Sequence, residues 1–286
     1  RRMALALVLV FLTASLLMTK LVDVQVVRAS ELQGESEAIR TTSETIWASR
    51  GSIVDSFGND LALDVDRYDV SADPSVSGDF RRAGETLSLE VALSEIADIT
   101  GANADEMLFA IRKDPEARFT YLVKGVSPEV HLALRELGIP WLQMDLVRER
   151  TYPFGPVAGN ITGMLGTDQP LAGVELDWDD CLAADNGVAT YQRGADGVRL
   201  PGTTETVVDP VHGGDVVLTI DSDLQWYVLQ QLAEHGSRLG AEHGSAMVVR
   251  VSDGHILAAA DWPTFDPNDF AQTPTSNTGA RVFSSP

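Results

Sequence analysis

Two different patterns predict that the first 46 residues are helical. Met3 to Met18 form an uncharged apolar run, with two arginines before it and a lysine soon after it. As a helix this run would be about 24 Å long, close to the apolar thickness of a bilayer once the flanking basic side chains reach the headgroups. We therefore expect a single membrane-spanning anchor over residues 1–22, with the rest of the chain outside the cytoplasm. A cleaved signal peptide is the alternative. The polar stretch 22–46 has loose helical spacing and is expected to continue as a helix beside the membrane.

The middle of the chain mixes strand and helix patterns. Residues 61–72 alternate apolar and polar positions like a half-buried strand, and the segment before them supplies a Gly-Asn turn. Apolar residues at helical spacing predict helices over 84–101, 104–112 and 128–137, with a short strand over 119–125. This mixture predicts an α+β fold.

The pattern is clearest from residue 215 onward. Residues 215–220 are expected to form a strand, followed by a helix capped by Asp221 or Ser222. Residues 246–251 and 255–261 are predicted to pair as a hairpin through an Asp-Gly turn. A strand, a helix and a hairpin are typical of the opening of a mixed α/β sheet.

Composition removes several classes of function. The chain has 21 basic and 42 acidic residues, a formal net charge of −21, so its field repels phosphate-rich partners and no nucleic-acid partner is expected. The single cysteine, Cys181, excludes an internal disulfide and is expected to be a small buried side chain. The sequence contains no zinc-ligand spacing, no calcium-loop spacing and no phosphate-binding glycine loop, so neither a metal nor a cofactor is expected.

Three motifs occur in order along the chain. The first comprises Arg50, Gly51, Ile53, Asp55, Gly58, Leu61 and Ala62. The second comprises Arg150, Tyr152 and Pro153, followed by Ala158 and Gly163. The third comprises Gly173, Val174, Glu175, Trp178 and Asp179. In this order the motifs resemble the pedestal of class B penicillin-binding proteins, although Ser56 stands where that family usually has arginine.

This resemblance implies a particular organisation of domains. It comprises the transmembrane anchor over 1–22, a mixed strand and helix pedestal (dimerisation) domain over 23–205, and the first strands and helix of a mixed α/β transpeptidase domain over 206–286. The resemblance also implies that Arg50 and Glu175 pair within the pedestal, as architecture and not as catalysis. The structural motif residues it designates are Arg50, Gly51, Asp55, Gly58, Arg150, Gly173, Glu175 and Asp179.

The same resemblance implies a chemistry that the sequence itself does not contain. In the family a serine within Ser-x-x-Lys is acylated, because the neighbouring lysine helps to activate its hydroxyl. No such tetrad occurs here: Lys20, Lys113 and Lys124 are preceded at the required offset by Leu17, Ala110 and Tyr121. The chain begins at Arg1 and ends at Pro286 within a polar stretch, so we expect both ends to be truncated and the nucleophile to lie beyond Pro286.

The full-length protein is therefore expected to be a penicillin-binding peptidoglycan D,D-transpeptidase that acts in septum formation, although an elongation role stays open. Its expected partners are nascent peptidoglycan stem peptides, a membrane-embedded cell-wall glycosyltransferase, divisome proteins and, at full length only, β-lactams. Residues 1–286 alone are expected to be inactive. The alternatives are a non-catalytic, membrane-anchored scaffold that binds a cell-wall polymerase and, more distantly, a secreted sensor or substrate-binding domain.

Overall fold

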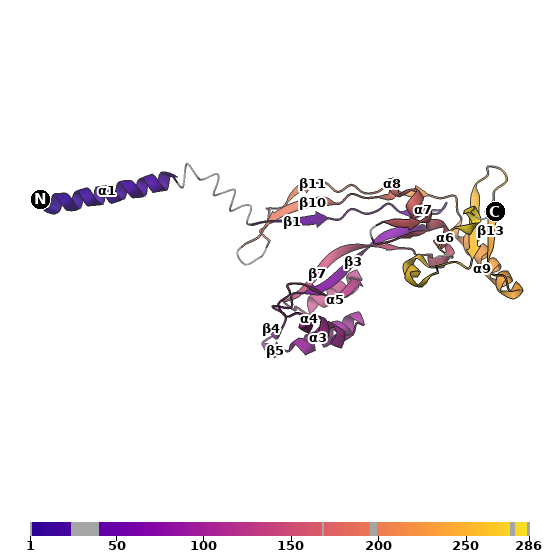
Figure 1. Ribbon diagram of the computed structural model, residues 1–286, viewed down its shortest axis with the longest axis horizontal. Helices are drawn as coiled ribbons and strands as arrows, with labels where there is room; N and C mark the ends of the chain where they lie inside the picture. The colour runs from indigo at the N-terminus through magenta and orange to yellow at the C-terminus, as the bar shows by residue number, and fades with distance from the viewer. Residues whose placement is uncertain (1, 24–39, 168, 195–198, 275–277, 285–286) are drawn as a thin grey trace. The chain divides into compact units, whose positions relative to one another are not determined.

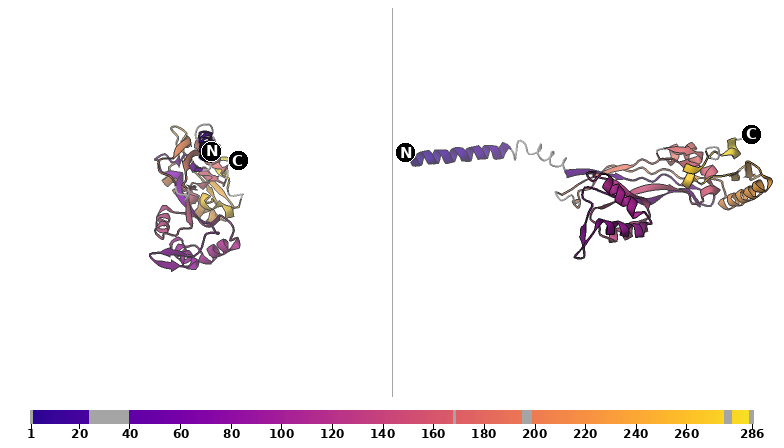
Figure 2. Two further views of the ribbon diagram at one scale, coloured as in Figure 1. Left: turned by 90° about the vertical axis from the view of Figure 1, so that its left-hand side faces the viewer. Right: turned by 60° about the horizontal axis from the view of Figure 1, so that its bottom comes forward.

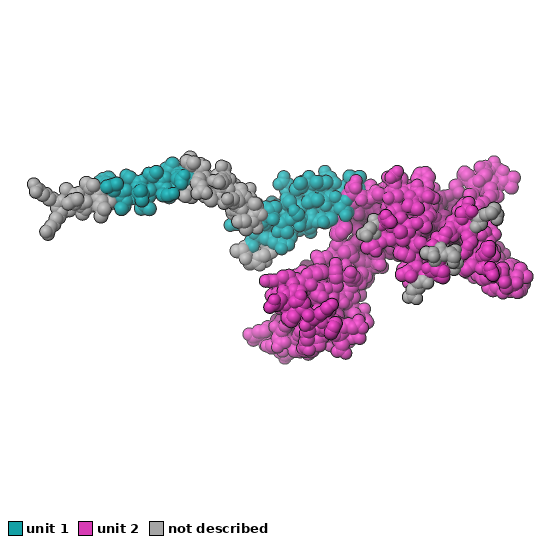
Figure 3. Space-filling model, in the orientation of Figure 1, with its two compact units in different colours: residues 1–46, 186–211 teal, residues 47–185, 212–286 magenta. Residues whose placement is uncertain are grey.

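The computed structural model describes residues 2–23, 40–167, 169–194, 199–274 and 278–284 (Figure 1). The chain divides into two compact units, one formed by residues 1–46 and 186–211 and the other by residues 47–185 and 212–286 (Figure 3).

In chain order the helices and strands are α1 (Arg2–Val22), β1 (Thr41–Ile46), β2 (Ile53–Val54), β3 (Asp60–Ala72), β4 (Phe80–Arg82), β5 (Glu85–Leu87), α3 (Leu89–Thr100), α4 (Ala104–Lys113), β6 (Thr120–Val126), α5 (Pro128–Glu136), β7 (Leu142–Thr151), the 3₁₀ helix η2 (Gly155–Val157), α6 (Gly159–Thr162), β8 (Met164–Leu165), β9 (Pro170–Ala172), α7 (Gly173–Asp177), α8 (Asp179–Leu182), β10 (Gly187–Gln192), β11 (Glu205–Val208), β12 (Val216–Val217), α9 (Ser222–Leu239), β13 (Gly244–Val249), β14 (Ile256–Trp262), the 3₁₀ helix η3 (Pro267–Gln272) and α10 (Arg281–Ser284).

The first unit contains α1 and a three-stranded antiparallel sheet in the order β1-β10-β11. The helix predicted over 22–46 is wrong for residues 41–46, because their main chain pairs with β10, from Thr41 opposite Gln192 to Ile46 opposite Gly187. Residues 24–39 of that prediction lie outside the described part of the chain. Among the helices that the structure describes, none is both long enough and apolar enough to cross a bilayer. The anchor expected over 1–22 stays a prediction.

Strand β3 organises the sheet of the second unit. It pairs with β7 along most of its length, from Leu63 opposite Thr151 to Ala72 opposite Leu142, and with β6 and β2 over shorter stretches. The predicted strand over 61–72 is confirmed, as is the turn before it, where Gly58 adopts a φ of 85°. The strand predicted over 215–220 is shorter: only Val216–Val217 pair, in parallel with β2, before the chain turns into α9.

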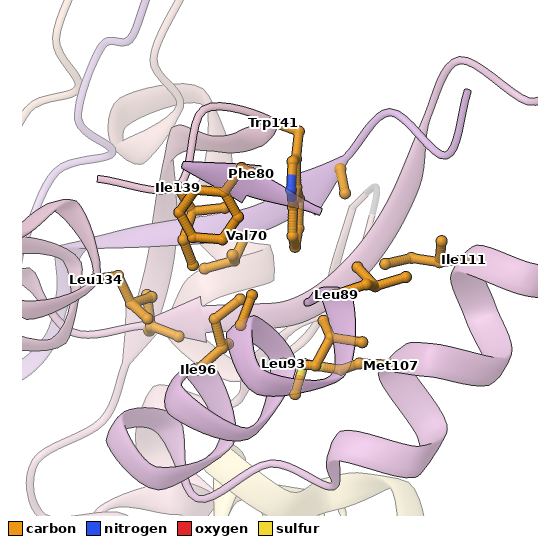
Figure 4. Close-up of a cluster of buried hydrophobic side chains, with 13 residues drawn as sticks. Val70, Phe80, Leu89, Leu93, Ile96, Met107, Ile111, Leu134, Ile139 and Trp141 are labelled. Atoms are coloured by element: carbon orange, nitrogen blue, oxygen red, sulfur yellow. The ribbon is translucent and has the colours of Figure 1, made fainter. Parts of the chain in front are cut away.

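Helices α3, α4 and α5 confirm the helical prediction for most of the middle of the chain and lie together beside one end of the β3–β7 pair (Figure 1, Figure 2). The helix predicted over 84–101 is wrong for residues 85–87, because their main chain pairs with β4 as strand β5 before α3 begins at Leu89. Their ends follow local capping rules. Ser88, Asn103 and Ser127 cap their N-termini with side-chain oxygens, and α3 ends at Gly101, whose φ is 74°. Apolar side chains from these helices and the neighbouring strands point toward one another in a single core (Figure 4); its buried members are Val70, Ala72, Phe80, Leu89, Ala92, Leu93, Ile96, Met107, Ile111, Val126, Leu134, Ile139 and Trp141.

The C-terminal part of the second unit confirms the predicted helix and hairpin. Asp221 caps α9 by accepting a hydrogen bond from the main-chain N–H of Leu224, and β13 pairs antiparallel with β14. The expectation that Cys181 is buried is wrong, since the residue is exposed. In the short helix α8 the inward position belongs to its neighbour Leu182, which is 0% exposed.

Candidate functional site

A buried carboxylate, Glu175, lies at the centre of the motif residues. Its side chain is 0% exposed. Arg50 donates from Nε to Oε2 at 2.7 Å, and Arg150 donates from Nε to Oε1 at 2.7 Å. The hydroxyl of Tyr152 donates to Oε1 at 3.3 Å. The pairing of Arg50 with Glu175 that the resemblance implied is therefore confirmed.

Two further carboxylates complete this ion network. Arg50 donates from Nη1 to Asp179 Oδ1 at 2.6 Å, and from Nη2 to the main-chain carbonyl of Glu175 at 2.9 Å. Asp64 accepts from the main-chain N–H of Arg50 at 2.8 Å and from Arg150 Nη1 at 3.2 Å. Charge-assisted bonds of this kind fix geometry as well as contributing energy. The network thus ties the chain before β2, the β3–β7 pair and the short helices α7 and α8 into one unit.

The electrostatics of the network follow from its burial. Burial opposes the charged form of Arg50, but hydrogen bonds to Asp179 and Glu175 outweigh that effect and raise the pKa of Arg50 above its ordinary value. Burial raises the pKa of Tyr152, and the negative charge of Glu175 raises it further. Tyr152 therefore keeps its proton, which it directs to Glu175 while its oxygen accepts from the main-chain N–H of Leu165 at 2.8 Å. Arg50 and Tyr152 are therefore suited to holding a fixed geometry and not to exchanging protons near neutral pH.

The local backbone explains why the motifs need their glycines. A Cβ atom on Gly51 would lie 2.0 Å from the carbonyl oxygen of Gly214, so no larger residue fits where these two segments cross. Gly173 has a φ of 65°, and a Cβ atom there would lie 2.5 Å from the main-chain nitrogen of Gly163. Both glycines thus permit close main-chain approaches that bring Arg50 and Glu175 within reach of one another.

A second buried carboxylate, Asp55, joins the turn before β3 to the start of α9. Asp55 is 0% exposed. Its Oδ1 accepts from the main-chain N–H groups of Phe57 at 2.8 Å and Asn59 at 2.9 Å. Its Oδ2 accepts from the hydroxyl of Ser222 at 2.6 Å and from the Asn59 side chain at 2.8 Å. Burial raises the pKa of Asp55, but hydrogen bonds from Ser222 and Asn59 outweigh it and hold the pKa well below the ordinary aspartate value.

The designated motif residues therefore fall into three places. Arg50, Arg150, Glu175 and Asp179 meet in the ion network, Asp55 and Gly58 form the turn that reaches α9, and Gly51 and Gly173 lie at close main-chain crossings. Within the described ranges no group of three or more His, Cys, Asp or Glu residues is placed to hold a metal ion.

Sequence reasoning missed Asp64 and Ser222. Asp64 lies directly opposite Arg150 in the β3–β7 register, and only that register marks it as a member of the network. Ser222 was expected as a possible helix cap, but Asp221 has that role, while the hydroxyl of Ser222 binds Asp55.

The comparisons with known proteins place this geometry in a family. Residues 45–170 match the penicillin-binding protein dimerisation domain. The chain is 32% identical to the penicillin-binding protein PbpB of Mycobacterium tuberculosis over 283 residues, covering 94% of this chain and 41% of the relative. It is 28% identical to the peptidoglycan D,D-transpeptidase FtsI of Escherichia coli K12, covering 93% of this chain and 44% of the relative.

A solved structure gives the same result at the level of fold. The crystal structure of a peptidoglycan synthetase from Bifidobacterium adolescentis matches with a TM-score of 0.56 and 29% identity, covering 85% of this chain and 48% of the other. The chain thus spans less than half the length of each of these three proteins. Arg50, Arg150 and the β3–β7 pair that carries Asp64 all lie inside the matched segment, and over residues 45–170 the chain carries the dimerisation domain of penicillin-binding proteins.

Proposed function

We propose that this chain is the pedestal and the opening part of a peptidoglycan D,D-transpeptidase, and that the residues which perform acyl transfer lie beyond Pro286. Relatives over more than 90% of the chain carry the names of penicillin-binding proteins and of peptidoglycan D,D-transpeptidases. In the reaction we propose for the whole protein, a serine hydroxyl attacks the carbonyl of the D-Ala-D-Ala bond of a stem peptide and expels D-alanine. An amine of a neighbouring stem peptide then attacks the resulting ester and releases the serine.

The observation that carries this proposal is how firmly the pedestal holds the segment after residue 212. Asp55 binds Ser222 at the start of α9. The side chain of Asn268 donates to the carbonyl of Tyr152 at 2.9 Å and accepts from the main-chain N–H of the same residue at 3.0 Å. Gln225 is 1% exposed and donates to the carbonyl of Val157 at 3.0 Å. A pedestal bonded at three separate points to the beginning of a second domain is suited to carrying a catalytic domain in a fixed position.

Labelling with a fluorescent penicillin tests the proposal. The full-length protein is expected to form a covalent, saturable adduct, because β-lactams acylate the same serine as the stem peptide does. Residues 1–286 are expected to remain unlabelled at equal concentration, because none of their lysines is preceded by serine at the Ser-x-x-Lys offset. Saturable labelling of residues 1–286 would contradict the placement of the nucleophile. A full-length protein that binds a cell-wall polymerase but takes no label would instead be a scaffold.

The proposal includes a location at the cell membrane, with α1 as the anchor and most of the chain outside the cytoplasm. The support is the uncharged run from Met3 to Met18 and the exposure of apolar side chains on α1, such as Phe11 at 71% and Leu16 at 70%. Membrane fractionation with an alkaline wash tests this location. The protein should stay in the pellet with its N-terminal run intact, whereas recovery in the wash, or of a chain cleaved after this run, would count against an anchor.

The partners that follow from this location are nascent stem peptides, a membrane-embedded glycosyltransferase and divisome proteins. A transpeptidase needs new glycan strands within its reach, so a polymerase held in the same membrane would supply them. Co-purification of the full-length protein with a glycosyltransferase from detergent extracts tests this partnership, and a version that lacks residues 1–22 serves as the control.

A further inference from the structure

A third buried carboxylate, Asp261, has no part in the networks described above. It lies near the end of β14 and is 1% exposed. Ser245 donates from its hydroxyl to Oδ1 at 2.5 Å, and Asn160 donates from its side chain to Oδ2 at 3.4 Å. The main-chain N–H of Val282 reaches both oxygens, at 3.0 and 3.2 Å. Burying a carboxylate costs free energy unless hydrogen bonds compensate, so an aspartate at this buried position indicates a specific role for its hydrogen bonds.

What these bonds hold in place is α10. A helix of four residues makes few hydrogen bonds of its own, so its orientation depends on outside partners. Asp261 supplies the acceptor for its main chain, and Arg281 adds a bond from Nη1 to the carbonyl of Pro263 at 3.3 Å. Val282 packs against the small buried cluster of Ile161, Ile220 and Ala259. The direction in which the chain leaves residue 284 is therefore set largely by Asp261 and this packing.

Asp261 also links α10 to the pedestal. Asn160 belongs to α6, where it is 3% exposed, and its side chain bonds both to Asp261 and to the carbonyl of Ala259 at 3.0 Å. Ser245 comes from the neighbouring strand β13. One carboxylate thus gathers donors from the pedestal, the hairpin and α10.

We propose that Asp261 is a positioning residue for acyl transfer: by fixing α10 it sets the position of the serine that follows in the full-length chain. This inference rests on the proposed function. It also goes beyond it, because it assigns the placement of the nucleophile to a residue 25 positions before the last residue of this sequence. A reacting group displaced by about 1 Å loses roughly a hundredfold in rate, so the rate of acylation reports directly on this role.

The test compares full-length proteins that carry Asp261→Ala, Asp261→Asn or the control Asp253→Asn. Asp253 lies in the exposed turn of the same hairpin, where it pairs with Arg250, so its substitution removes a charge without touching α10. The rate constant of acylation and the fraction of protein labelled are measured separately with fluorescent penicillin. Hydrogen exchange of the peptide containing residues 278–284 is measured on the same samples.

Asp261→Ala is expected to lower the acylation rate constant by about tenfold to a hundredfold and to speed amide exchange in α10. Asp261→Asn, which keeps one acceptor for Val282, should lie between Asp261→Ala and the unchanged protein and provides the answer if the alanine variant does not fold. The control should match the unchanged protein. Unchanged acylation rate constants in both Asp261 variants would overturn the inference. A smaller labelled fraction that still reacts at the original rate would also overturn it, because it would show that Asp261 affects only how much of the protein folds. If the unchanged full-length protein takes no label, the proposed function fails, and this inference fails with it.

Discussion

Replacing Glu175 by glutamine removes the negative charge from the centre of the ion network. Arg50 and Arg150 each have a side chain that is at most 11% exposed, and both direct Nε to this carboxylate. Glutamine keeps the shape but offers one oxygen in place of two, and its amide NH₂ meets a guanidinium donor. Removing one partner of a buried ion pair costs about 3–5 kcal/mol, because the remaining charge stays buried without compensation. For a unit of this size that cost corresponds to a fall in Tm of roughly 6–20 °C.

Thermal unfolding monitored by tryptophan fluorescence and circular dichroism measures this effect. The matched control is Glu149→Gln, which removes the same charge from a pair on the β3–β7 sheet where Glu149 is 53% exposed and bonds to Arg67. Exposed pairs contribute less than about 1 kcal/mol, so the control should shift the Tm by only a few degrees. Equal shifts in the two variants would refute the view that Glu175 holds the pedestal together.

Three further predictions concern the same unit. Gly51→Ala should destabilise the chain by about 1–3 kcal/mol or more, since its Cβ would lie 2.0 Å from a carbonyl oxygen, whereas Gly78→Ala, with open space around it, should be nearly neutral in thermal unfolding. Tyr152→Phe should lower the free energy of unfolding by about 1–3 kcal/mol, because the main-chain N–H of Leu165 loses its acceptor. The double variant Tyr152→Phe, Glu175→Gln should lose less stability than the two single variants lose together, and full additivity would place Tyr152 outside the network. The lowered pKa of Asp55 means that its contribution to stability is complete above the unfolded value of about 3.9 and is lost as pH falls toward the lower folded value. The Tm difference between the unchanged chain and Asp55→Asn should therefore shrink below about pH 4, and a difference that stays constant would contradict this assignment.

Local signals in the sequence predicted those elements that depend on near neighbours. Helix α3 begins after Ser88 and ends at Gly101, and both caps are bonds within a few residues. The hairpin β13–β14 follows from an Asp-Gly turn between two apolar runs. Residues 41–46 were wrongly predicted as helix because their structure depends on a distant partner. They form strand β1 by pairing with β10, and nothing nearby in the sequence indicates that partner.

The candidate site divides in the same way. Arg50 and Glu175 were paired through a resemblance between motifs, and the structure contains that pair. Asp64 became visible only through the register that sets it opposite Arg150. Asp261 has no motif of its own, and its importance arises from burial together with donors that come from three separate elements. Residues of that kind require coordinates, because their partners are brought together only by the completed fold.

The parallel pairing of β12 with β2 has a consequence for how the chain folds during its synthesis. The main-chain N–H of Ser52, next to β2, finds its acceptor on Asp215, 163 residues later. At a synthesis rate of about 5–20 residues per second, that edge waits roughly 8–30 s for its neighbour. An unpaired strand edge is a template for pairing with another chain, so the edge of β2 stays open until residue 217 has been synthesised, and the two-residue length of β2 keeps that edge short. The last residue of the family match, 170, is accordingly a boundary of sequence similarity and not a place where folding is complete.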